Sequence, residues 1–334
     1  YILRAHLLCA AWEQGLSKED TQYFGPNFQT QIEELVATNE LKERHGRWFL
    51  SPSIAQPARN INIRSTSGVT FALIDTSTGS LLETIEADDA FFQVHPGAIY
   101  LHQGESYLVT NLDLITHTAY CLPSDANYYT QTKELSDLKI LKVWRTKHVG
   151  NVEVSLGEVE VTTTVIGYKR KSQFTEEVLG EEVLDLPPVT INTVSLWFDI
   201  PDKSIKRIET EELDFAGAIH AVEHAAIGIL PLFALCDRND IGGLSTPLHP
   251  DTGKPQIFIH DGHPGGVGIA EKGYEIITEL WQATLDTVKN CPCQEGCPSC
   301  IQSPKCGNNN KPLDKKAALI LLEQLVFNSK KANS

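Results

Sequence analysis

The segment CPCQEGCPSCIQSPKC, residues 291–306, holds five of the chain's eight cysteines. Pro292, Pro298 and Pro304 interrupt this segment and prevent a regular helix or strand. Because the segment lacks regular backbone hydrogen bonding, it needs another kind of cross-link. Disulfides or a metal ion could supply it.

The distribution of the remaining cysteines favours a metal. Small secreted scaffolds are short and spread their cysteines along the sequence, whereas this chain has 334 residues and its other cysteines are far apart, at Cys9, Cys121 and Cys236. The N-terminal segment does not read as a signal peptide, and no uninterrupted apolar run reaches the ~18 residues of a membrane span. We therefore expect a reducing, cytoplasmic setting and no membrane partner.

The cysteine spacing predicts a closed structural site for Zn²⁺. A CxxC pair, Cys297 and Cys300, lets two thiolates bind one ion while backbone amides point at the sulfurs. We expect four of five cysteines to bind Zn²⁺, with the first four preferred: Cys291, Cys293, Cys297, Cys300 and Cys306. The alternative set replaces Cys291 with Cys306. An iron–sulfur cluster uses the same ligands, so the spacing leaves it open.

Hydrophobic periodicity predicts an α+β chain that begins with a winged-helix-like unit at residues 1–55. Two apolar stripes at helical spacing are followed by LKERHGRWFLS, which reads as a hairpin around Gly46. The stripes are Leu7, Leu8, Ala11 and Trp12, then Phe28, Ile32, Leu35 and Val36. Residues 51–59 read as a linker.

Two further regions follow. Period-two patterns separated by turn residues predict an antiparallel β region at residues 60–205, either a barrel or a strongly curved sheet. Residues 206–334 predict an α/β zinc-binding domain, with a buried helix that bends or ends near Pro231 and with the cysteine loop between two helices.

The net charge of −15 excludes nonspecific nucleic-acid coating by the whole surface, so any contact with DNA requires local basic patches. Two basic patches are candidates, at residues 139–148 and 169–171, and Trp144 in the first patch could stack on a base. In a regular strand Lys142 and Trp144 point away from Lys139, Arg145 and Lys147, so a curved strand or a bulge would be needed to bring them to one face. The expected nucleic-acid residues are Lys139, Lys142, Trp144, Arg145 and Lys147, next to His148, and then Lys169, Arg170 and Lys171.

Two motifs each allow two interpretations. His220, Glu223 and His224 form HxxEH, the signature of inverted zinc peptidases, but a buried hydrogen-bond network that fixes helix packing is the favoured interpretation. The glycine-rich segment 262–268 follows an expected strand and precedes a helix, as a phosphate-binding loop does. It matches neither GxxxxGK[ST] nor GxGxxG, so a tight turn is favoured.

Three segments in order resemble the C-terminal zinc-binding domain of superfamily-two DEAD/DEAH-box DNA helicases, namely the MrfA-type helicases and their RecQ-like relatives. These segments are IHAVEHAAIGILPLFALCDRNDIGG, IFIHDGHPGGVGIAEKG and CPCQEGCPSCIQSPKCGNNNKPLDKKAA. The upstream part is similar to the region that joins the winged helix to that domain. The resemblance implies an ATP-dependent 3′-to-5′ DNA translocase in DNA repair, with zinc on Cys291, Cys293, Cys297 and Cys300.

The chain contains no phosphate-loop lysine motif and no DEAD or DEAH box, so we expect the ATP-binding motor to lie elsewhere in a longer parent chain. The absence of any methionine fits this expectation. The sequence thus predicts an accessory DNA-handling region, acting on single-stranded DNA beside its motor domains. The alternative is a zinc metallopeptidase that uses the HxxEH motif.

Overall fold

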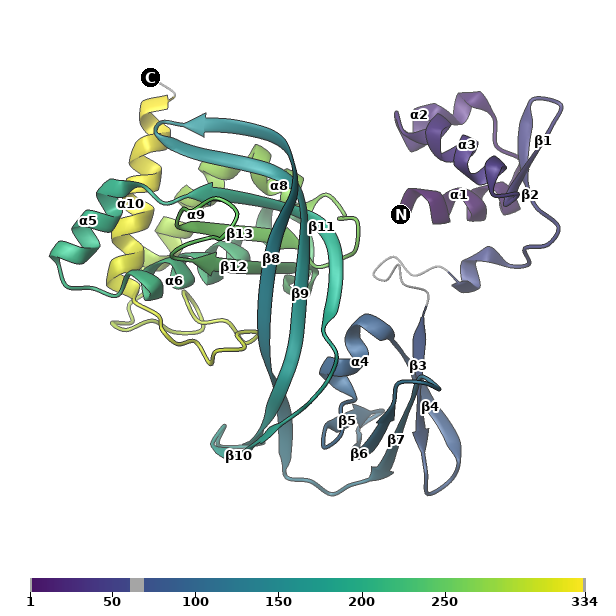
Figure 1. The fold of residues 1–334 in the computed structure, drawn as a ribbon, viewed down its shortest axis with the longest axis horizontal. Coiled ribbons are helices and arrows are strands. Elements are labelled where there is room, and N and C mark those ends of the chain that lie inside the picture. Colours follow the sequence, from purple (N-terminus) through teal and green to yellow (C-terminus); the bar gives the residue numbers. More distant parts are fainter. Residues whose placement is uncertain (1, 61–68, 333–334) are drawn as a thin grey trace. The chain divides into compact units, whose positions relative to one another are not determined.

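The computed structural model describes residues 2–60 and 69–332. It contains two compact units, Tyr1–Ala72 with Glu83–Ala90 and Leu73–Leu82 with Phe91–Ser334. Figure 1 shows mixed helices and antiparallel sheets, which confirms the predicted α+β class.

The first unit has the expected helices and hairpin. Its helices are α1 (Ile2–Glu13), α2 (Thr21–Phe24) and α3 (Phe28–Ala37), and β1 (Leu41–Arg44) pairs with β2 (Arg47–Leu50). His45 and Gly46 occupy the turn with φ values of 53° and 74°. Positive φ at both central residues is typical of a two-residue hairpin turn, so local sequence determines this hairpin.

The core of the first unit contains most of the predicted apolar stripes. Its buried side chains are Leu7, Ala11, Leu16, Phe28, Ile32, Leu35, Leu41 and Trp48. Trp12 was expected in the stripe but is 54% exposed. The prediction was wrong here because Trp48, from the hairpin, packs against Phe28 with ring centroids 6.1 Å apart and supplies the core's indole.

A five-stranded antiparallel sheet has the order β4-β3-β7-β6-β5. Helix α4 (Ala87–Gln93), which the sequence did not predict, follows β4. The expected strand at residues 60–65 lies almost wholly outside the described residues. The strands are β3 (Thr70–Asp75), β4 (Ser80–Glu86), β5 (Ile99–His102), β6 (Glu105–Asp113) and β7 (Thr118–Pro123).

A long curved hairpin joins the predicted middle region to the zinc-binding domain (Figure 1). Strand β8 (Tyr128–Val149) pairs with β9 (Val152–Ser172) along most of their length, and β8 lies at the edge. The sheet continues in the open order β10-β9-β11-β13-β12, so it is curved rather than closed into a barrel. One sheet therefore contains strands from both sides of residue 205: β10 (Val178–Val183), β11 (Val189–Asp199), β12 (Ile241–Thr246) and β13 (Gln256–Asp261).

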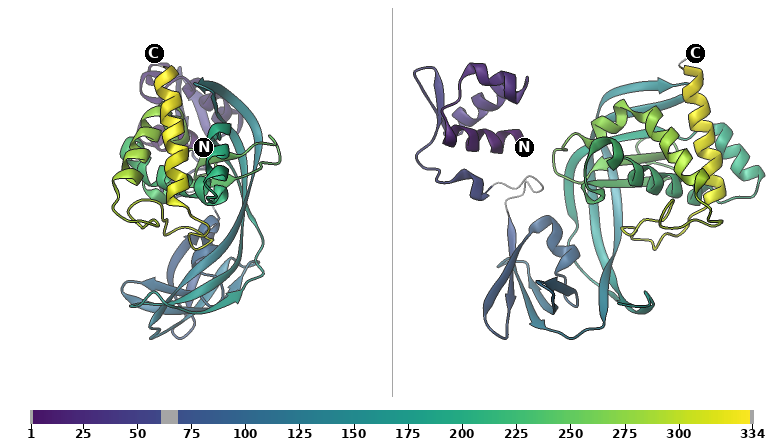
Figure 2. Two further views of the ribbon diagram at one scale, coloured as in Figure 1. Left: turned by 90° about the vertical axis from the view of Figure 1, so that its left-hand side faces the viewer. Right: turned by 180° about the vertical axis from the view of Figure 1, so that it is seen from behind.

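Helices cover one face of this sheet, as the view from behind shows (Figure 2). Leu196, Phe198 and Ile257 point into this main core, whereas Trp197 and Phe258 alternate to the other face and form a smaller core there. The helices are α5 (Asp202–Thr210), α6 (Phe215–Ile229), α7 (Pro231–Ala234), α8 (Ile269–Glu275), α9 (Ile277–Asn290) and α10 (Lys315–Ala332).

Helix α6 ends just before Pro231, as predicted. Among the described residues, the helical run Phe215–Ala234 is long and apolar enough to cross a membrane, but 61% of its apolar window is buried inside the structure. It is the central helix of the main core, in contact with α9, α10 and β12.

Candidate metal centre and nucleic-acid interface

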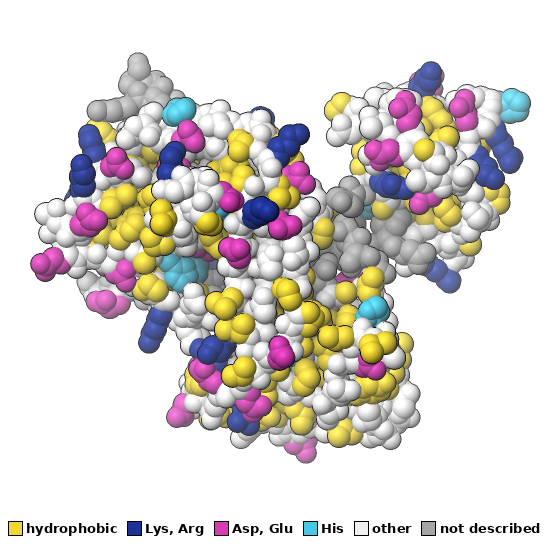
Figure 3. Space-filling model, viewed as in Figure 1, with side chains coloured by type: hydrophobic (Ala, Val, Ile, Leu, Met, Phe, Trp, Pro, Cys, Tyr) yellow, Lys and Arg dark blue, Asp and Glu magenta, His cyan; other side chains and the backbone are white. Residues whose placement is uncertain are grey.

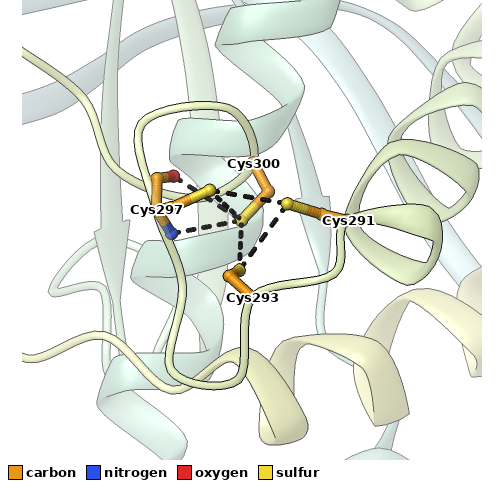
Figure 4. Close-up of side chains that lie close together, drawn as sticks. All are labelled: Cys291, Cys293, Cys297 and Cys300. Carbon is orange, nitrogen blue, oxygen red and sulfur yellow. Dashed lines mark hydrogen bonds between the residues drawn. The ribbon is translucent and has the colours of Figure 1, made fainter.

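Four cysteine thiols converge in the loop after α9 (Figure 4). The Sγ–Sγ distances are 3.6 Å for Cys291–Cys293, 3.4 Å for Cys291–Cys297, 3.5 Å for Cys293–Cys300 and 3.7 Å for Cys297–Cys300. A tetrahedron with Zn–S bonds of ~2.3 Å has an edge of ~3.8 Å. The four sulfurs therefore fit one zinc ion after a small expansion.

Local backbone geometry presents these thiols. Cys291 directly follows the last residue of α9, and the Cys297 carbonyl accepts hydrogen bonds from the N–H groups of Cys300, Ile301 and Gln302 in a tight turn. The Cys297 N–H points at the Cys300 Sγ, 3.3 Å away, as expected for a CxxC turn. The loop begins at the end of α9 and ends at the start of α10, so a bound ion would hold the two helices together.

Lys315, which the sequence analysis missed, supports the cluster from α10. Its Nζ donates to the carbonyls of Cys291 and Cys293, both at 2.8 Å, and lies 3.3 Å from the Cys293 Sγ. Only 6% of Lys315 is exposed. Four thiolates around one divalent ion leave a net negative charge, and this ammonium partly neutralises it.

The thiol environments differ within the cluster. Burial raises the pKa of Cys293, but hydrogen bonds from Cys300, Lys315 and the other thiols outweigh it and lower the pKa to about 6. Burial raises the pKa of Cys300 to about 12. Metal binding requires thiolates, so a divalent ion would displace the protons of these thiols.

Cys306 does not belong to this cluster. It lies with His220 and His224, and the ligand atoms of these three residues are all within 4.8 Å of one another. The alternative zinc set, which replaces Cys291 with Cys306, does not match this arrangement.

Glu223 of the HxxEH motif is not part of either group. It is 7% exposed and hydrogen bonds to Ser245, and burial raises the pKa of its carboxyl. The two imidazoles donate to backbone carbonyls, His220 to Pro312 and His224 to Ile301. These contacts hold α6 against neighbouring backbone, and Glu223 does not join the two histidines as the HxxEH motif of a peptidase requires.

The glycine-rich segment after β13 forms a tight turn, the favoured interpretation. The buried Asp261 carboxylate accepts the N–H groups of Val267 at 2.5 Å, Gly268 at 2.9 Å, Ile269 at 3.3 Å and Ala270 at 2.6 Å. This carboxylate occupies the position at the start of α8 that a phosphate would need.

The first basic patch lies on the edge strand β8. The register of β8 against β9 shifts between Ile140 and Lys142 and again between Val143 and Arg145. Residues directly opposite in an antiparallel pair share a face. The residues of β9 that lie opposite these cations all have even numbers and therefore share one face of the sheet: Glu160, Glu158, Leu156 and Val154. The two bulges thus bring four cations of β8 to one face, namely Lys139, Lys142, Arg145 and Lys147.

The two ends of this patch differ. Arg145 and Lys147 lie over the Tyr274 ring of α8, 4.7 and 4.4 Å from its centroid, and Lys147 also donates to the Tyr274 carbonyl. Burial lowers the pKa of Lys147. Lys139 and Lys142 are exposed, and Trp144, at the second bulge, is 43% exposed.

The second basic patch is largely neutralised by β10. Lys169 is 5% exposed, with its Nζ 3.6 Å from the Glu181 carboxylate, and Arg170 lies 3.5 Å from Glu182. Lys171 pairs with Tyr129 of β8 and is half-buried. On the face shown in Figure 3, Lys and Arg side chains lie among Asp and Glu rather than forming one continuous basic surface.

Comparison with known families gives two matches along the chain. A model described as the winged helix domain of ATP-dependent helicase HRQ1 matches residues 1–66, and a model described as the MrfA Zn-binding domain matches residues 222–301. The second match contains all four clustered cysteines.

Two similar proteins are described as helicases, and a third is uncharacterized. The uncharacterized ATP-dependent helicase YprA of Bacillus subtilis is 32% identical over 305 residues, which cover 90% of this chain and 40% of that protein. ATP-dependent helicase HRQ1 of Saccharomyces cerevisiae is 26% identical over 98% of this chain and 32% of its own length. An uncharacterized protein of Methanocaldococcus jannaschii is 45% identical over 113 residues, 99% of its length and 32% of this chain. The chain therefore spans less than half the length of YprA and of HRQ1.

Solved structures agree with the sequence matches. The crystal structure of the DUF1998 helicase MrfA bound to DNA superposes with a TM-score of 0.58 and 28% identity, over 97% of this chain and 42% of MrfA. MrfA bound to DNA and AMPPNP gives a TM-score of 0.53 over 96% of this chain and 40% of MrfA. The chain thus matches the C-terminal region of MrfA- and Hrq1-type helicases in sequence and in fold.

Proposed function

We propose that this chain is the accessory DNA-handling and zinc-binding region of an ATP-dependent 3′-to-5′ DNA helicase that acts in DNA repair. The observation that carries the proposal is the similarity of nearly the whole chain to DNA-bound MrfA, supported by the matches to the winged-helix and Zn-binding families. DEAD/DEAH-box motor domains in the same parent chain would bind ATP. A reducing cytoplasm suits the clustered thiols, which form no disulfide in the described residues.

In this role one Zn²⁺ is structural and is bound by Cys291, Cys293, Cys297 and Cys300. The closed set of four sulfurs leaves no coordination position for a substrate. The ion fixes the loop between α9 and α10 and so orders the helices that pack behind the sheet.

Single-stranded DNA is the proposed partner, through the edge strand β8. Lys139, Lys142 and Arg145 share one face there, and Trp144 offers an exposed indole for base stacking. The hairpin of the first unit presents further exposed cations, Lys42, Arg44 and Arg47. Because the net charge is −15, we expect weak and salt-sensitive binding unless the motor domains hold the strand nearby.

Fluorescence anisotropy with a labelled single-stranded oligonucleotide at two salt concentrations tests the β8 surface. Arg145→Ala should reduce the slope of log affinity against log salt by ~0.7, the contribution of one phosphate contact on a single strand. Trp144→Ala should weaken binding equally at both salt concentrations because stacking is not ionic. Arg207→Ala is the matched control, since Arg207 is an exposed arginine on α5. If both β8 variants bind like the control, β8 is not a DNA surface.

A further inference from the structure

A second group of ligand-type side chains lies beside the four-cysteine cluster. His220 and His224 come from consecutive turns of α6, with ring centroids 4.2 Å apart, and Cys306 comes from the loop that precedes α10. All three ligand atoms lie within 4.8 Å of one another, and both His224 and Cys306 are buried.

The hydrogen bonds of the two histidines fix their tautomers. The Nδ1 of His220 lies 2.9 Å from the Pro312 carbonyl, and the Nδ1 of His224 lies 3.0 Å from the Ile301 carbonyl. A carbonyl only accepts, so each Nδ1 carries the hydrogen, and the Nε2 of each neutral ring keeps a lone pair. Metal-binding histidines are typically oriented in this way, with the distal nitrogen held by a backbone carbonyl.

The third ligand atom of the group is the Sγ of Cys306. The Nε2 of His220 is 3.5 Å from the Cys306 Sγ, which also accepts the N–H of Asn310 at 3.2 Å. One thiol proton can satisfy only one imidazole lone pair, whereas one cation would satisfy both imidazoles and a thiolate.

The loop is preorganised around Cys306. The Asn310 side chain holds it closed, since its Oδ1 accepts the Ser303 N–H at 2.7 Å and its Nδ2 donates to the Ser303 carbonyl at 3.0 Å. Cys306 therefore sits in a turn whose geometry is fixed independently of any ion.

We propose that His220, His224 and Cys306 form a second metal site, which binds one Zn²⁺-class ion through two imidazole Nε2 atoms and one thiolate. The three residues line a cavity of about 460 Å³, from which a water molecule could take the fourth position. Three protein ligands and an open position distinguish this site from the closed four-sulfur cluster. The ion links α6 to the loop after Cys300, and Glu223 is not a ligand.

Metal content of the full 334-residue chain, purified from zinc-supplemented cells, tests the site by mass spectrometry. We expect two zinc ions per chain, and one in His220→Asn and in Cys306→Ala. Asparagine at position 220 keeps a donor near the Nδ1 position for the Pro312 carbonyl but removes the Nε2 ligand, so it isolates coordination from packing. The control variants His6→Asn and Cys9→Ser lie in α1 and should keep both ions.

X-ray absorption at the zinc edge identifies the ligands. The wild-type chain should show sulfur at ~2.3 Å together with nitrogen at ~2.0–2.1 Å, and Cys306→Ala should show sulfur alone. A wild-type chain that binds a single, all-sulfur zinc ion even with excess Zn²⁺ or Co²⁺ overturns the proposal, and the group is then a hydrogen-bonded packing contact. The wild-type measurement decides the question even if a variant fails to fold, and the all-sulfur signal reports separately on the four-cysteine site.

Discussion

At the scale of single residues, Lys315 shows how one buried charge supports a metal cluster. Its stem is covered and its ammonium contacts two carbonyls and one sulfur of the four-cysteine loop. A buried ammonium is costly unless it is paired and hydrogen bonded. A zinc-bound thiolate cluster supplies both the negative charge and the acceptors, so the lysine and the metal stabilise each other.

We therefore predict that Lys315→Met weakens zinc binding about 10- to 100-fold, the usual effect of losing a group that supports metal ligands. Methionine keeps an apolar stem but donates no hydrogen bond. The rate of zinc release to a chromogenic chelator measures the change. Lys316→Met is the matched control, because Lys316 is exposed and pairs with Glu211. Equal release rates for the two variants would show that Lys315 does not support the cluster.

At the scale of elements, the turn between β13 and α8 depends on one carboxylate. Asp261 is fully buried and accepts N–H groups from residues 267 to 270, so it satisfies donors that a helix start leaves free. Gly266 is needed in this turn because its φ is +74° and a Cβ would lie 2.6 Å from the Val194 side chain. Gly266 thus allows close packing against β11.

Asp261→Asn should lower the free energy of unfolding by about 2 kcal/mol or more, because it removes a charged acceptor and directs an amide donor at other donors. Urea denaturation followed by circular dichroism measures this loss. The control is Asp286→Asn, in which the exposed carboxylate of α9 is neutralised. Similar urea midpoints for both variants would contradict the role assigned to Asp261.

At the scale of the whole molecule, the zinc loop and the first unit have separate cores. The core of the first unit contains none of the clustered cysteines, whereas Cys300 belongs to the main core and three other clustered cysteines pack against it. Metal-binding energy is folding energy in such sites. Zinc should therefore stabilise the second unit and leave the first unaffected.

We predict that zinc removal, or Cys297→Ser, exposes α9 and α10 to hydrogen exchange while α1 and α3 keep their protection. Mass spectrometry of peptides from each element measures exchange locally. Cys236 lies outside both groups of possible metal ligands, so Cys236→Ser should keep the zinc and the protection of α9 and α10. Unchanged protection of these helices in zinc-free protein would refute the structural role of the metal.

Features that depend on residues close together in the chain could be predicted from the sequence alone. The four preferred cysteines converge because a zinc loop is a local structure, the hairpin at His45 and Gly46 follows from its turn residues, and α6 ends before Pro231 because proline cannot continue the helical hydrogen bonds.

Features that depend on contacts between distant segments became visible only in the folded structure. Regular alternation along β8 predicted that Lys139 and Lys142 point to opposite faces of the sheet, but two bulges bring both to one face. The residue pattern of the strand does not reveal these bulges. Likewise, the ammonium of Lys169 pairs with a carboxylate of β10 because β10 folds back against β9. Cys306 contacts His220, which lies 86 residues away in the sequence. Such a contact depends on the chain topology, because local spacing and residue type do not indicate which distant segments will pack together.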